Sequence, residues 1–293
     1  MTNITPFIET RALTHIYNEG ASFEKTALDN INLKIEYGEC VGIIGHTGSG
    51  KSTLIQHLNA LLKPTSGQVL VDGLDINADK KALKKIRERI GLVFQYPEHQ
   101  LFDLTVYKDV SFGPLNMGIS KEETDVRVRE SLRQVGLSEE FYEKSPFELS
   151  GGQKRRAAIA GVLAMRPELL ILDEPTAGLD RRGRDEILNH IKALRDEKNR
   201  QTIILVTHSM EDIARVTSRL MVMSHGKIVC DGVSAEVFDR KAELLESIGL
   251  AVPQIAELAR RLREKGVGIP EGVMTSGPAA EALFKLANEK GLI

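Results

Sequence analysis

The sequence predicts an α/β fold: a parallel-sheet core around a glycine-rich turn, with an N-terminal antiparallel β subdomain, an inserted helical subdomain and a C-terminal helical extension. Residues 40–58 have the pattern of a short apolar strand, a glycine-rich turn and a helix. Two further apolar runs, at 169–172 and 202–206, flank a helical segment at 184–198, which is typical of a βαβ unit in a sheet covered on both faces. A block with helical spacing, residues 96–165, interrupts the strands and predicts the inserted subdomain.

Composition places the chain among well-cored globular proteins. It has 293 residues, of which 42% are hydrophobic and 27% charged, with a formal net charge of −2. This balance gives no indication of nucleic-acid or anionic-lipid binding. The two cysteines, Cys40 and Cys230, lack metal-ligand spacing and are expected to be reduced in a cytosolic protein, although spacing alone leaves a disulfide open. No apolar run approaches the ~20 residues of a membrane span, and residues 1–6 do not resemble a signal peptide.

The elements before the glycine-rich turn alternate in hydrophobicity as antiparallel strands do. Residues 8–16 and 28–35 show this alternation, and 68–71 reads as a strand that Asp72-Gly73 turns into a hairpin. Beyond them, residues 79–89 predict a basic helix with Ala82, Leu83 and Ile86 on one face. Its basic side chains are more simply explained as a solvated face than as a contact for phospholipid or nucleic acid.

The remaining elements follow from the same patterns. Residues 90–94 read as a buried strand, and Val126, Val128, Leu132 and Val135 recur at helical spacing within the inserted block. Residues 220–230 predict a hairpin that ends the core, and from Ser234 onward two or three amphipathic helices are expected.

The glycine-rich turn has the residue types that bind a nucleotide triphosphate. It reads Gly45-His46-Thr47-Gly48-Ser49-Gly50-Lys51-Ser52. Glycines let several backbone N–H groups point at one anion, and the following helix adds the positive end of its dipole. Lys51 is able to reach the β- and γ-phosphates, and the Ser52 hydroxyl is a suitable ligand for Mg²⁺. The pattern is that of the phosphate-binding loop (P-loop), and we therefore expect a nucleotide triphosphate with Mg²⁺ here.

Residues at the ends of two later strands suit phosphoryl chemistry. Asp173 and Glu174 follow the run 169–172, so Asp173 is expected to hold Mg²⁺ on a strand beside the P-loop and Glu174 to orient the attacking water. His208 follows the run 202–206, and an isolated histidine there is more often structural. Its expected place beside Asp173 favours a γ-phosphate contact.

A second sequence has the properties of an anion cradle. Ser150 precedes Gly151, Gly152 and Gln153 at the start of a helix, so it is expected to cap that helix while the glycines leave N–H groups exposed. One γ-phosphate does not need two cradles in one chain. We therefore expect the second cradle to complete the site of another subunit.

With these motifs the chain, over about residues 8–235, resembles the ATP-binding-cassette (ABC) ATPases. Residues 45–53 resemble Walker A, 170–174 Walker B, 149–153 the signature and 178–180 the D-loop. The resemblance implies a RecA-like nucleotide-binding domain at 1–235, with the helical signature subdomain inserted at about 96–165. It also implies a head-to-tail dimer that holds two ATP molecules between P-loop and signature.

Site residues follow from the same resemblance. It implies catalysis by Glu174, His208 and Gln95, and Mg²⁺ at Ser52, Gln95 and Asp173. Tyr17 stands where the family places the aromatic residue that stacks on adenine, although an aromatic residue at the end of a strand more commonly belongs to the core. The other nucleotide contacts that the resemblance implies are Gly45, His46, Thr47, Gly48, Ser49, Gly50, Lys51, Ser52, Thr53, Ser150, Gly151, Gly152, Gln153 and Asp180.

A narrower resemblance is to the ATP-binding subunits of energy-coupling-factor transporters, carried by residues 94–102 (FQYPEHQLF), 45–59 and 173–180. It implies uptake of vitamins or metal ions, a second ABC ATPase, a membrane T component, substrate-binding S components and a place at the cytoplasmic face of the cell membrane. Phe94, Leu101 and Phe102 are the expected apolar anchors for the T component, with a core role equally open for Phe94. Residues 236–293 are compatible with dimerisation helices or with helices packed on their own domain.

Two alternatives stay open at this point. A conventional ABC importer subunit shares every catalytic motif, and only residues 94–102 argue against it. Soluble ABC ATPases that act on DNA usually carry long heptad coiled coils between the Walker motifs, and none is found here.

Overall fold

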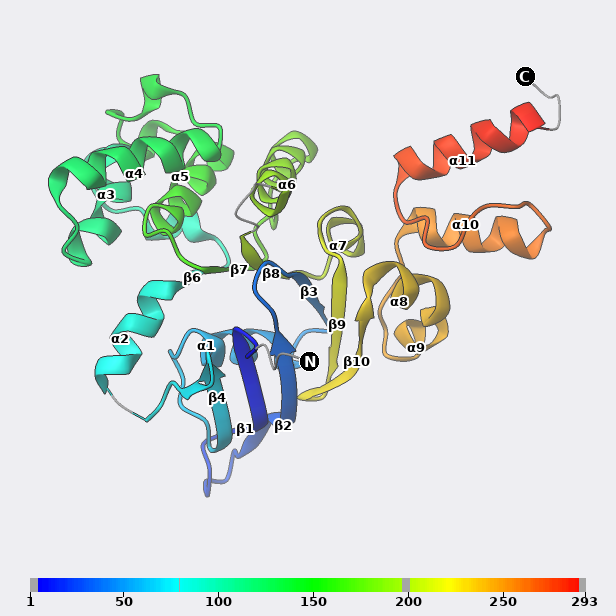
Figure 1. Ribbon diagram of the computed structural model, residues 1–293, viewed down its shortest axis with the longest axis horizontal. Coiled ribbons are helices and arrows are strands. Elements are labelled where there is room, and N and C mark those ends of the chain that lie inside the picture. The colour runs from blue at the N-terminus through cyan, green and yellow to red at the C-terminus, as the bar shows by residue number, and fades with distance from the viewer. Residues whose placement is uncertain (1–4, 79, 197–200, 290–293) are drawn as a thin grey trace.

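The computed structural model describes residues 5–78, 80–196 and 201–289, and it contains two sheets with helices around them (Figure 1). The larger sheet has the order β10-β9-β3-β8-β7-β6 and the smaller one the order β2-β1-β4-β5. The helices α3, α4 and α5 lie at one side of the larger sheet and α8 to α11 at the other (Figure 1). The predicted α/β class, with its antiparallel and helical additions, is confirmed.

The larger sheet is parallel except at one edge. Its strands are β3 (Cys40–Ile44), β6 (Ile90–Val93), β7 (Leu169–Asp173), β8 (Thr202–Val206), β9 (Arg219–Ser224) and β10 (Lys227–Val233). β3 pairs in parallel with both β8 and β9, and β10 pairs antiparallel with β9, as the predicted hairpin requires. β8 lies between β3 and β7, yet the carboxyl end of β7 reaches the P-loop, because the Ser52 hydroxyl lies 3.4 Å from Asp173 Oδ2, as the sequence predicts.

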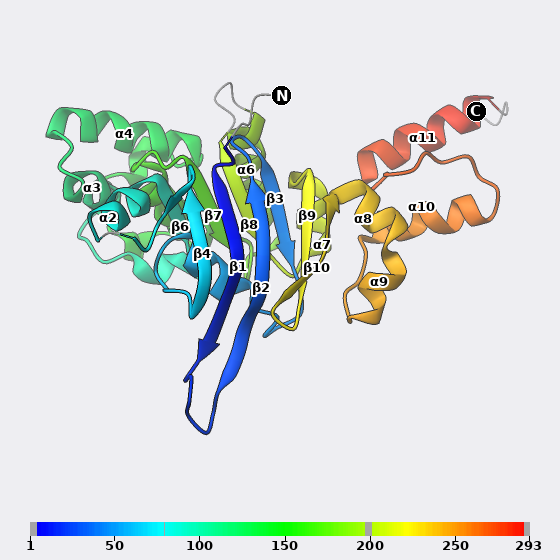
Figure 2. The same ribbon diagram turned by 60° about the horizontal axis from the view of Figure 1, so that its bottom comes forward.

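The smaller sheet is the predicted antiparallel subdomain. It comprises β1 (Ile8–Tyr17), β2 (Lys25–Ile35), β4 (Ser66–Val71) and β5 (Leu74–Asp75). Asp72 and Gly73 both have positive φ, 50° and 78°, which is the backbone of a tight hairpin turn between β4 and β5. The β1–β2 hairpin extends beyond the body of the molecule (Figure 2).

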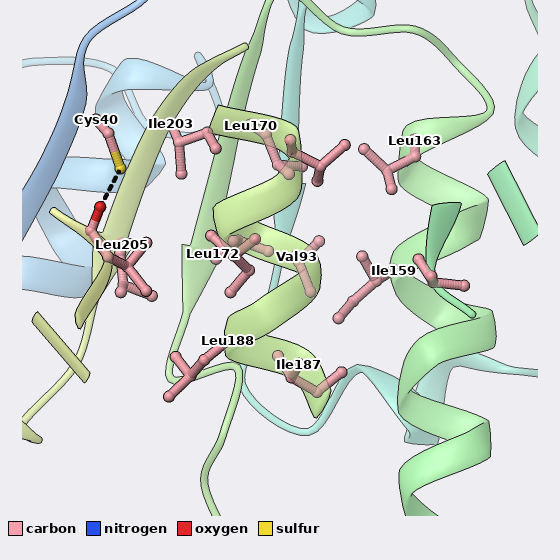
Figure 3. Close-up of a cluster of buried hydrophobic side chains, with 14 of the residues drawn as sticks. Cys40, Val93, Ile159, Leu163, Leu170, Leu172, Ile187, Leu188, Ile203 and Leu205 are labelled. Carbon is pink, nitrogen blue, oxygen red and sulfur yellow. Dashed lines mark hydrogen bonds between the residues drawn. The ribbon is translucent and has the colours of Figure 1, made fainter. Parts of the chain in front are cut away.

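Both faces of the larger sheet are buried, which explains the continuous apolar runs. Leu169, Ile171, Ile204 and Val206 pack with α1 (Lys51–Leu58) and the smaller sheet. The alternate residues of β7 and β8, Leu170, Leu172, Ile203 and Leu205, pack with α5 (Gly151–Leu163) and α6 (Arg181–Asp196), as Figure 3 shows. Successive side chains of a strand point to opposite faces, so a strand between two packed layers must be apolar at every position.

Cys40 lies in this second cluster, where its thiol donates a hydrogen bond to the Val216 carbonyl at 3.5 Å (Figure 3). Burial raises the pKa of Cys40 to about 12, so the thiol stays protonated. Cys230 is also a free thiol, as predicted.

The inserted block is helical as predicted. It contains α3 (Val106–Asn116), α4 (Lys121–Gln134), α5 and three short 3₁₀ segments, η1 (Pro97–Gln100), η2 (Glu139–Phe141) and η3 (Pro146–Glu148), and it follows α2 (Lys80–Arg89) and β6. Ile86 of α2 is buried and Leu83 packs against the core, whereas Asp79 and the Ala82 side chain lie outside what the structure describes.

Val126, one residue of the predicted helical stripe, lies on the opposite face of α4. Val128, Leu132 and Val135 are buried at i, i+4 and i+7, but the Val126 side chain is 53% exposed. Two residues before Val128, Val126 is rotated by about 200° around the helix, which places it on the solvent side.

The C-terminal part has more helices than the sequence suggested. After α7 (Met210–Val216) and the β9–β10 hairpin come four, α8 (Ser234–Arg240), α9 (Ala242–Ser247), α10 (Gln254–Glu264) and α11 (Ser276–Glu289), instead of two or three. α8 and α9 pack on the domain, while α10 and α11 share a small cluster around Ala259 and Ile269 and extend away from it (Figures 1 and 2). No helix within the described ranges is both long and apolar enough to span a membrane.

The two valines of α4 provide a matched test of this packing. We expect Val128→Ala to lower the free energy of unfolding by about 2 kcal/mol, because the side chain is fully buried and its loss leaves a cavity. Val126→Ala removes the same atoms from the solvent face and is expected to change stability by less than about 0.5 kcal/mol. Urea titration of both variants measures the difference, and equal destabilisation would contradict the helix orientation.

Candidate active site

The glycine-rich turn wraps backbone N–H groups around the start of α1. Gly48 and Gly50 have φ of 81° and 105°, and a Cβ on Gly50 would lie 2.5 Å from the Ala27 carbonyl oxygen. Only glycine fits this position. α1 begins directly after Gly50 without a side-chain cap or an acidic residue in its first turn, so its N–H groups and dipole remain available to an anion.

The Lys51 ammonium lies inside this turn. Its Nζ donates to the carbonyl oxygens of Gly45, at 2.6 Å, and His46, at 3.1 Å. Burial lowers the pKa of Lys51, and the nearby carboxylates of Glu174 and Asp173 oppose that shift. The residue therefore places a positive charge at the mouth of the anion cradle, next to two acids.

A cavity of about 720 Å³ brings most of the sequence-predicted site residues together. Its centre lies at the carboxyl ends of β3, β7 and β8, where ligands bind in open α/β sheets. The predicted residues that line it are Tyr17, Gly45, His46, Thr47, Gly48, Gly50, Lys51, Ser52, Thr53, Gln95, Asp173, Glu174 and His208.

The Ser49 side chain lies outside the cavity, whereas Tyr17 lies at its rim. The Ser49 side chain is fully buried and does not line the cavity, so this residue is available only through its backbone. Tyr17 ends β1 at the rim, partly exposed, and its hydroxyl lies 3.3 Å from the Thr53 Oγ1. Its ring is therefore accessible at the cavity edge.

Asp173, Ser52 and Gln95 supply oxygen atoms at one side of the cavity. The Ser52 hydroxyl donates to Asp173 Oδ2 at 3.4 Å, and Gln95 faces the same cavity from the end of β6. Carboxylate, hydroxyl and amide oxygens are the ligands that Mg²⁺ prefers. Burial and the neighbouring Glu174 charge together raise the pKa of Asp173 to about 6, so a cation beside Asp173 would relieve an electrostatic cost.

Glu174 is held in a defined position by the end of β8. Its carboxylate accepts hydrogen bonds from the Thr207 hydroxyl at 3.1 Å, the His208 N–H at 2.9 Å and the His208 Nδ1 at 2.8 Å. An ionised carboxylate only accepts, so Nδ1 carries the proton in this arrangement. The Glu174 backbone has φ of +50°, a costly value for a non-glycine residue that often marks functional sites.

The structure adds Thr207, which the sequence analysis missed. The Ser209 N–H donates to the Thr207 hydroxyl oxygen at 3.1 Å, which directs the hydroxyl proton toward Glu174. A threonine at the end of an apolar strand carries no signal by itself. Only the pairing of β7 with β8, which brings Thr207 beside Glu174, reveals this role.

The cavity also includes residues from segments to which the sequence assigned no role here. These are Lys25, Ala27, Met210 and, from the C-terminal extension, Gly249, Leu250 and Ala251. Leu250 follows α9 and is buried against the core, so the extension reaches the cavity wall. Nothing in the local sequence of residues 249–251 signals this contact.

The second anion cradle does not face the same cavity. Ser150 caps α5 by accepting from the Gln153 N–H while Gln153 Oε1 accepts from the Ser150 N–H, a reciprocal capping box. Gly151 and Gly152 are open to a separate hollow of about 450 Å³, which Asp180 also lines. The P-loop and this cradle thus belong to two different sites on one chain.

Comparison with known proteins identifies the family. The model described as ABC transporter matches residues 28–177. A protein of Caldanaerobacter subterraneus named energy-coupling factor transporter ATP-binding protein EcfA2 is 57% identical over 278 residues, covering 95% of this chain and 96% of that one. The protein of the same name in Clostridium tetani is 54% identical over 284 residues and covers 97% and 98%.

Solved structures agree with the sequence relatives. The structure of cbiO1 from Clostridium perfringens, described as part of the ABC transporter complex cbiONQ, superposes with a TM-score of 0.74 at 41% identity and covers 87% of this chain and 99% of that one. A dimeric ATP-binding cassette in a post-hydrolysis state, bound to ADP and Pi, superposes with a TM-score of 0.69 at 35% identity, covering 78% and 98%.

The raised pKa of Asp173 predicts a pH-dependent stability cost. Between pH 3.8 and about pH 6 the Asp173 carboxyl group keeps its proton in the folded state and loses it in the unfolded state. The free energy of unfolding therefore falls as the pH rises through this range. We expect Asp173→Asn to be more stable than the wild type above pH 6, by on the order of 2–3 kcal/mol, and nearly equal below pH 4.

Thermal unfolding of both nucleotide-free proteins across this pH range measures the difference. The Asn side chain keeps an acceptor for Ser52, so the comparison isolates the charge. A wild type that is the more stable of the two at pH 7.5 would contradict the electrostatic account.

Proposed function

The chain belongs to the ABC transporter family, within the group of energy-coupling factor transporter ATP-binding proteins, and on this premise we propose that it binds and hydrolyses ATP to power uptake of vitamins or metal ions. The observation that carries the proposal is the shared cavity of the P-loop, two adjacent acids and a histidine. Those groups match the needs of phosphoryl transfer: a phosphate cradle, a cation site and a group that orients water.

In the proposed complex the residues of the turn hold the triphosphate. The N–H groups at the start of α1 and the Lys51 ammonium bind its oxygens, Lys51 exchanging its present carbonyl partners for phosphate. Tyr17 stacks on the adenine from the cavity rim. Ser52, Asp173 and Gln95 would hold Mg²⁺, and a bound Mg²⁺ would supply positive charge to the phosphate oxygens.

Glu174 is the proposed base of the hydrolysis step. It takes a proton from the attacking water as the new P–O bond forms and the bond to the leaving phosphate oxygen breaks in line. Thr207 and the His208 backbone N–H hold the carboxylate, while the His208 side chain, which is 75% exposed, is free to turn toward the γ-phosphate. The left-handed backbone of Glu174 fixes the direction in which the carboxylate points.

The separate position of the second cradle supports a two-chain site. Ser150, Gly151, Gly152 and Gln153 lie with Asp180 in their own hollow, so one chain alone cannot surround a nucleotide with both motifs. We propose that a second ABC ATPase, identical or related, supplies its cradle to this P-loop and receives this one in return. The solved dimer bound to ADP and Pi is a precedent for such pairing.

A groove beside the inserted helices is the proposed docking site for the membrane T component. It has a volume of about 690 Å³ and is lined by α2, α3, α5 and the segment after η1. Apolar side chains form much of its wall, and α2 adds the charged side chains of Lys84, Arg87 and Glu88. Phe102 and Phe112 meet edge to face at 5.0 Å and are both exposed at its surface. Leu101 also lines the groove, whereas Phe94 does not, so Phe94 is not supported as an anchor.

The remaining assignments complete the proposal. The subunit lies peripherally at the cytoplasmic face of the cell membrane, held there by the T component, and S components supply the substrate. Residues 1–235 form the nucleotide-binding domain with the signature subdomain at about 96–165, and residues 236–293 contribute to dimerisation. The exposed Leu283 and Phe284 of α11 support the last assignment. Nucleic acid is not an expected partner.

Replacing the proposed base tests the hydrolysis mechanism. We expect Glu174→Gln to bind ATP normally but to hydrolyse it at least about 100-fold more slowly, because the amide cannot accept the proton. ATP should then trap a closed dimer, seen as an earlier peak in size-exclusion chromatography. Lys51→Ala is the contrasting variant, with nucleotide affinity at least tenfold weaker and no trapped dimer. Normal turnover by Glu174→Gln would exclude Glu174 as the base.

Replacing an exposed groove residue tests the transport assignment. We expect Phe102→Ser to lose the membrane T component in a gentle-detergent pull-down from the native cells, while its ATPase rate without membrane partners stays within twofold of the wild type. The phenylalanine is 61% exposed, so its loss should not unfold the chain. Phe23→Ser, on the distant β1–β2 hairpin, is the matched control and should keep the partner.

The proteins that come down with the wild type separate the alternatives. A second ABC ATPase with T-like and small S-like membrane proteins supports the proposal, whereas conventional permeases would favour an ordinary importer. Recovery of nucleic-acid-bound or ribosomal proteins alone would overturn the transport assignment.

A further inference from the structure

The largest fully buried side chain of the described chain is a cation, Arg155, in the second turn of α5. It is only 1% exposed, yet its guanidinium has partners on three sides. Nε and Nη2 bind both oxygens of the Glu98 carboxylate, with an Nε–Oε2 distance of 2.9 Å. Nη1 donates to the carbonyl oxygens of Pro175, at 3.2 Å, and Ala177.

These partners join three functional segments. Glu98 lies in η1, between the proposed Mg²⁺ ligand Gln95 and the groove residues that follow. Pro175 directly follows Glu174, and Ala177 lies three residues after it, where its N–H donates to the Glu174 carbonyl oxygen at 3.1 Å and closes the turn that carries the base. Arg155 itself sits one turn after the second cradle.

Stability alone is a weak explanation for this pair. The desolvation of a buried guanidinium and carboxylate offsets much of their mutual attraction. Apolar residues of similar size at the same positions often give a protein of equal stability. Arginine is, however, suited to holding several segments in fixed relation, because its planar fork donates in several directions at once. The ring of Tyr96, which has φ of +55°, lies over the guanidinium with its centroid 5.7 Å from Cζ and restricts it further.

The arrangement links η1 and the Glu174 turn through a single guanidinium. If Glu98 shifts relative to α5, the guanidinium must follow and draw the carbonyls of Pro175 and Ala177 with it, or a buried charge loses its partners. The second outcome is strongly unfavourable. The groove is lined by Gln100 and Leu101, two and three residues after Glu98 in the chain, and by the later turns of the helix that carries Arg155.

We propose that Arg155 is a positioning residue that couples occupancy of the groove to hydrolysis, by transmitting the position of Glu98 to the turn that carries Glu174. This inference rests on the proposed function, because it assigns the groove to a membrane partner. It predicts that breaking the Arg155–Glu98 pair separates two quantities: intrinsic ATP hydrolysis survives, and its response to the docked partner is lost.

The experiment compares ATPase rates in two states of the protein. One is the membrane complex purified through a tag on this chain, and the other is the same ATPase without its membrane partners; their ratio measures coupling. For Arg155→Lys and Glu98→Gln we expect this ratio to fall at least fivefold. The KM for ATP and the rate without partners should stay within about threefold. Arg133→Lys is the control, since Arg133 pairs with Glu139 on the exposed surface at 3.1 Å, and should leave the ratio unchanged.

A double variant separates coupling from stability. Glu98→Met with Arg155→Met removes both charges, so neither is left unpaired, and its thermal midpoint should exceed that of either single Met variant. We expect coupling to remain lost in this stable protein. Recovery of coupling together with stability, or equal loss of rate in both states, would show a merely structural pair and overturn the inference. If the wild type itself recovers no membrane partner, the proposed function fails instead.

Discussion

The structure depends on one arrangement of strands, β3-β8-β7, in which two faces are packed and three carboxyl ends converge. β8 is buried at each of its five residues, and it orders both neighbours through its hydrogen bonds. Because the strands are parallel, whatever follows each of them is delivered to the same edge. The P-loop, the acids Asp173 and Glu174, and Thr207 with His208 meet there for that reason alone.

This convergence has an electrostatic cost that the ligand offsets. Two carboxylates and a partly buried ammonium share the cavity. The pKa of Asp173 is raised and the pKa of Lys51 is lowered, so both shifts favour the uncharged side chain. A protein selected only for stability would avoid such a group of charges. Bound triphosphate and cation supply the missing partners, so the same groups that weaken the empty site favour the occupied one.

Sequence periodicity could predict the parts of this fold that are local. The two-faced burial of 169–172 and 202–206, the glycine turn and the cap at Ser150 each follow from spacing or from one residue type. Val126 shows the limit, since an apolar residue near a helical stripe is assigned to it unless the phase is counted strictly. The strand order, and thus β8 between β3 and β7, depends on tertiary pairing that no local pattern encodes.

The residues that sequence reasoning missed share a physical cause: their partners are distant in the chain. The Thr207 hydroxyl donates to Glu174, which is 33 residues away in the chain, and the Arg155 guanidinium binds Glu98, which is 57 residues away. Both are side chains that orient something else, and neither needs a local motif. Phosphate cradles, in contrast, are built from consecutive backbone groups and so leave a readable signature. A cassette that must respond to events outside its cavity needs both kinds of residue. The motif residues make the chemistry possible, and the long-range contacts determine when the chemical groups are in position.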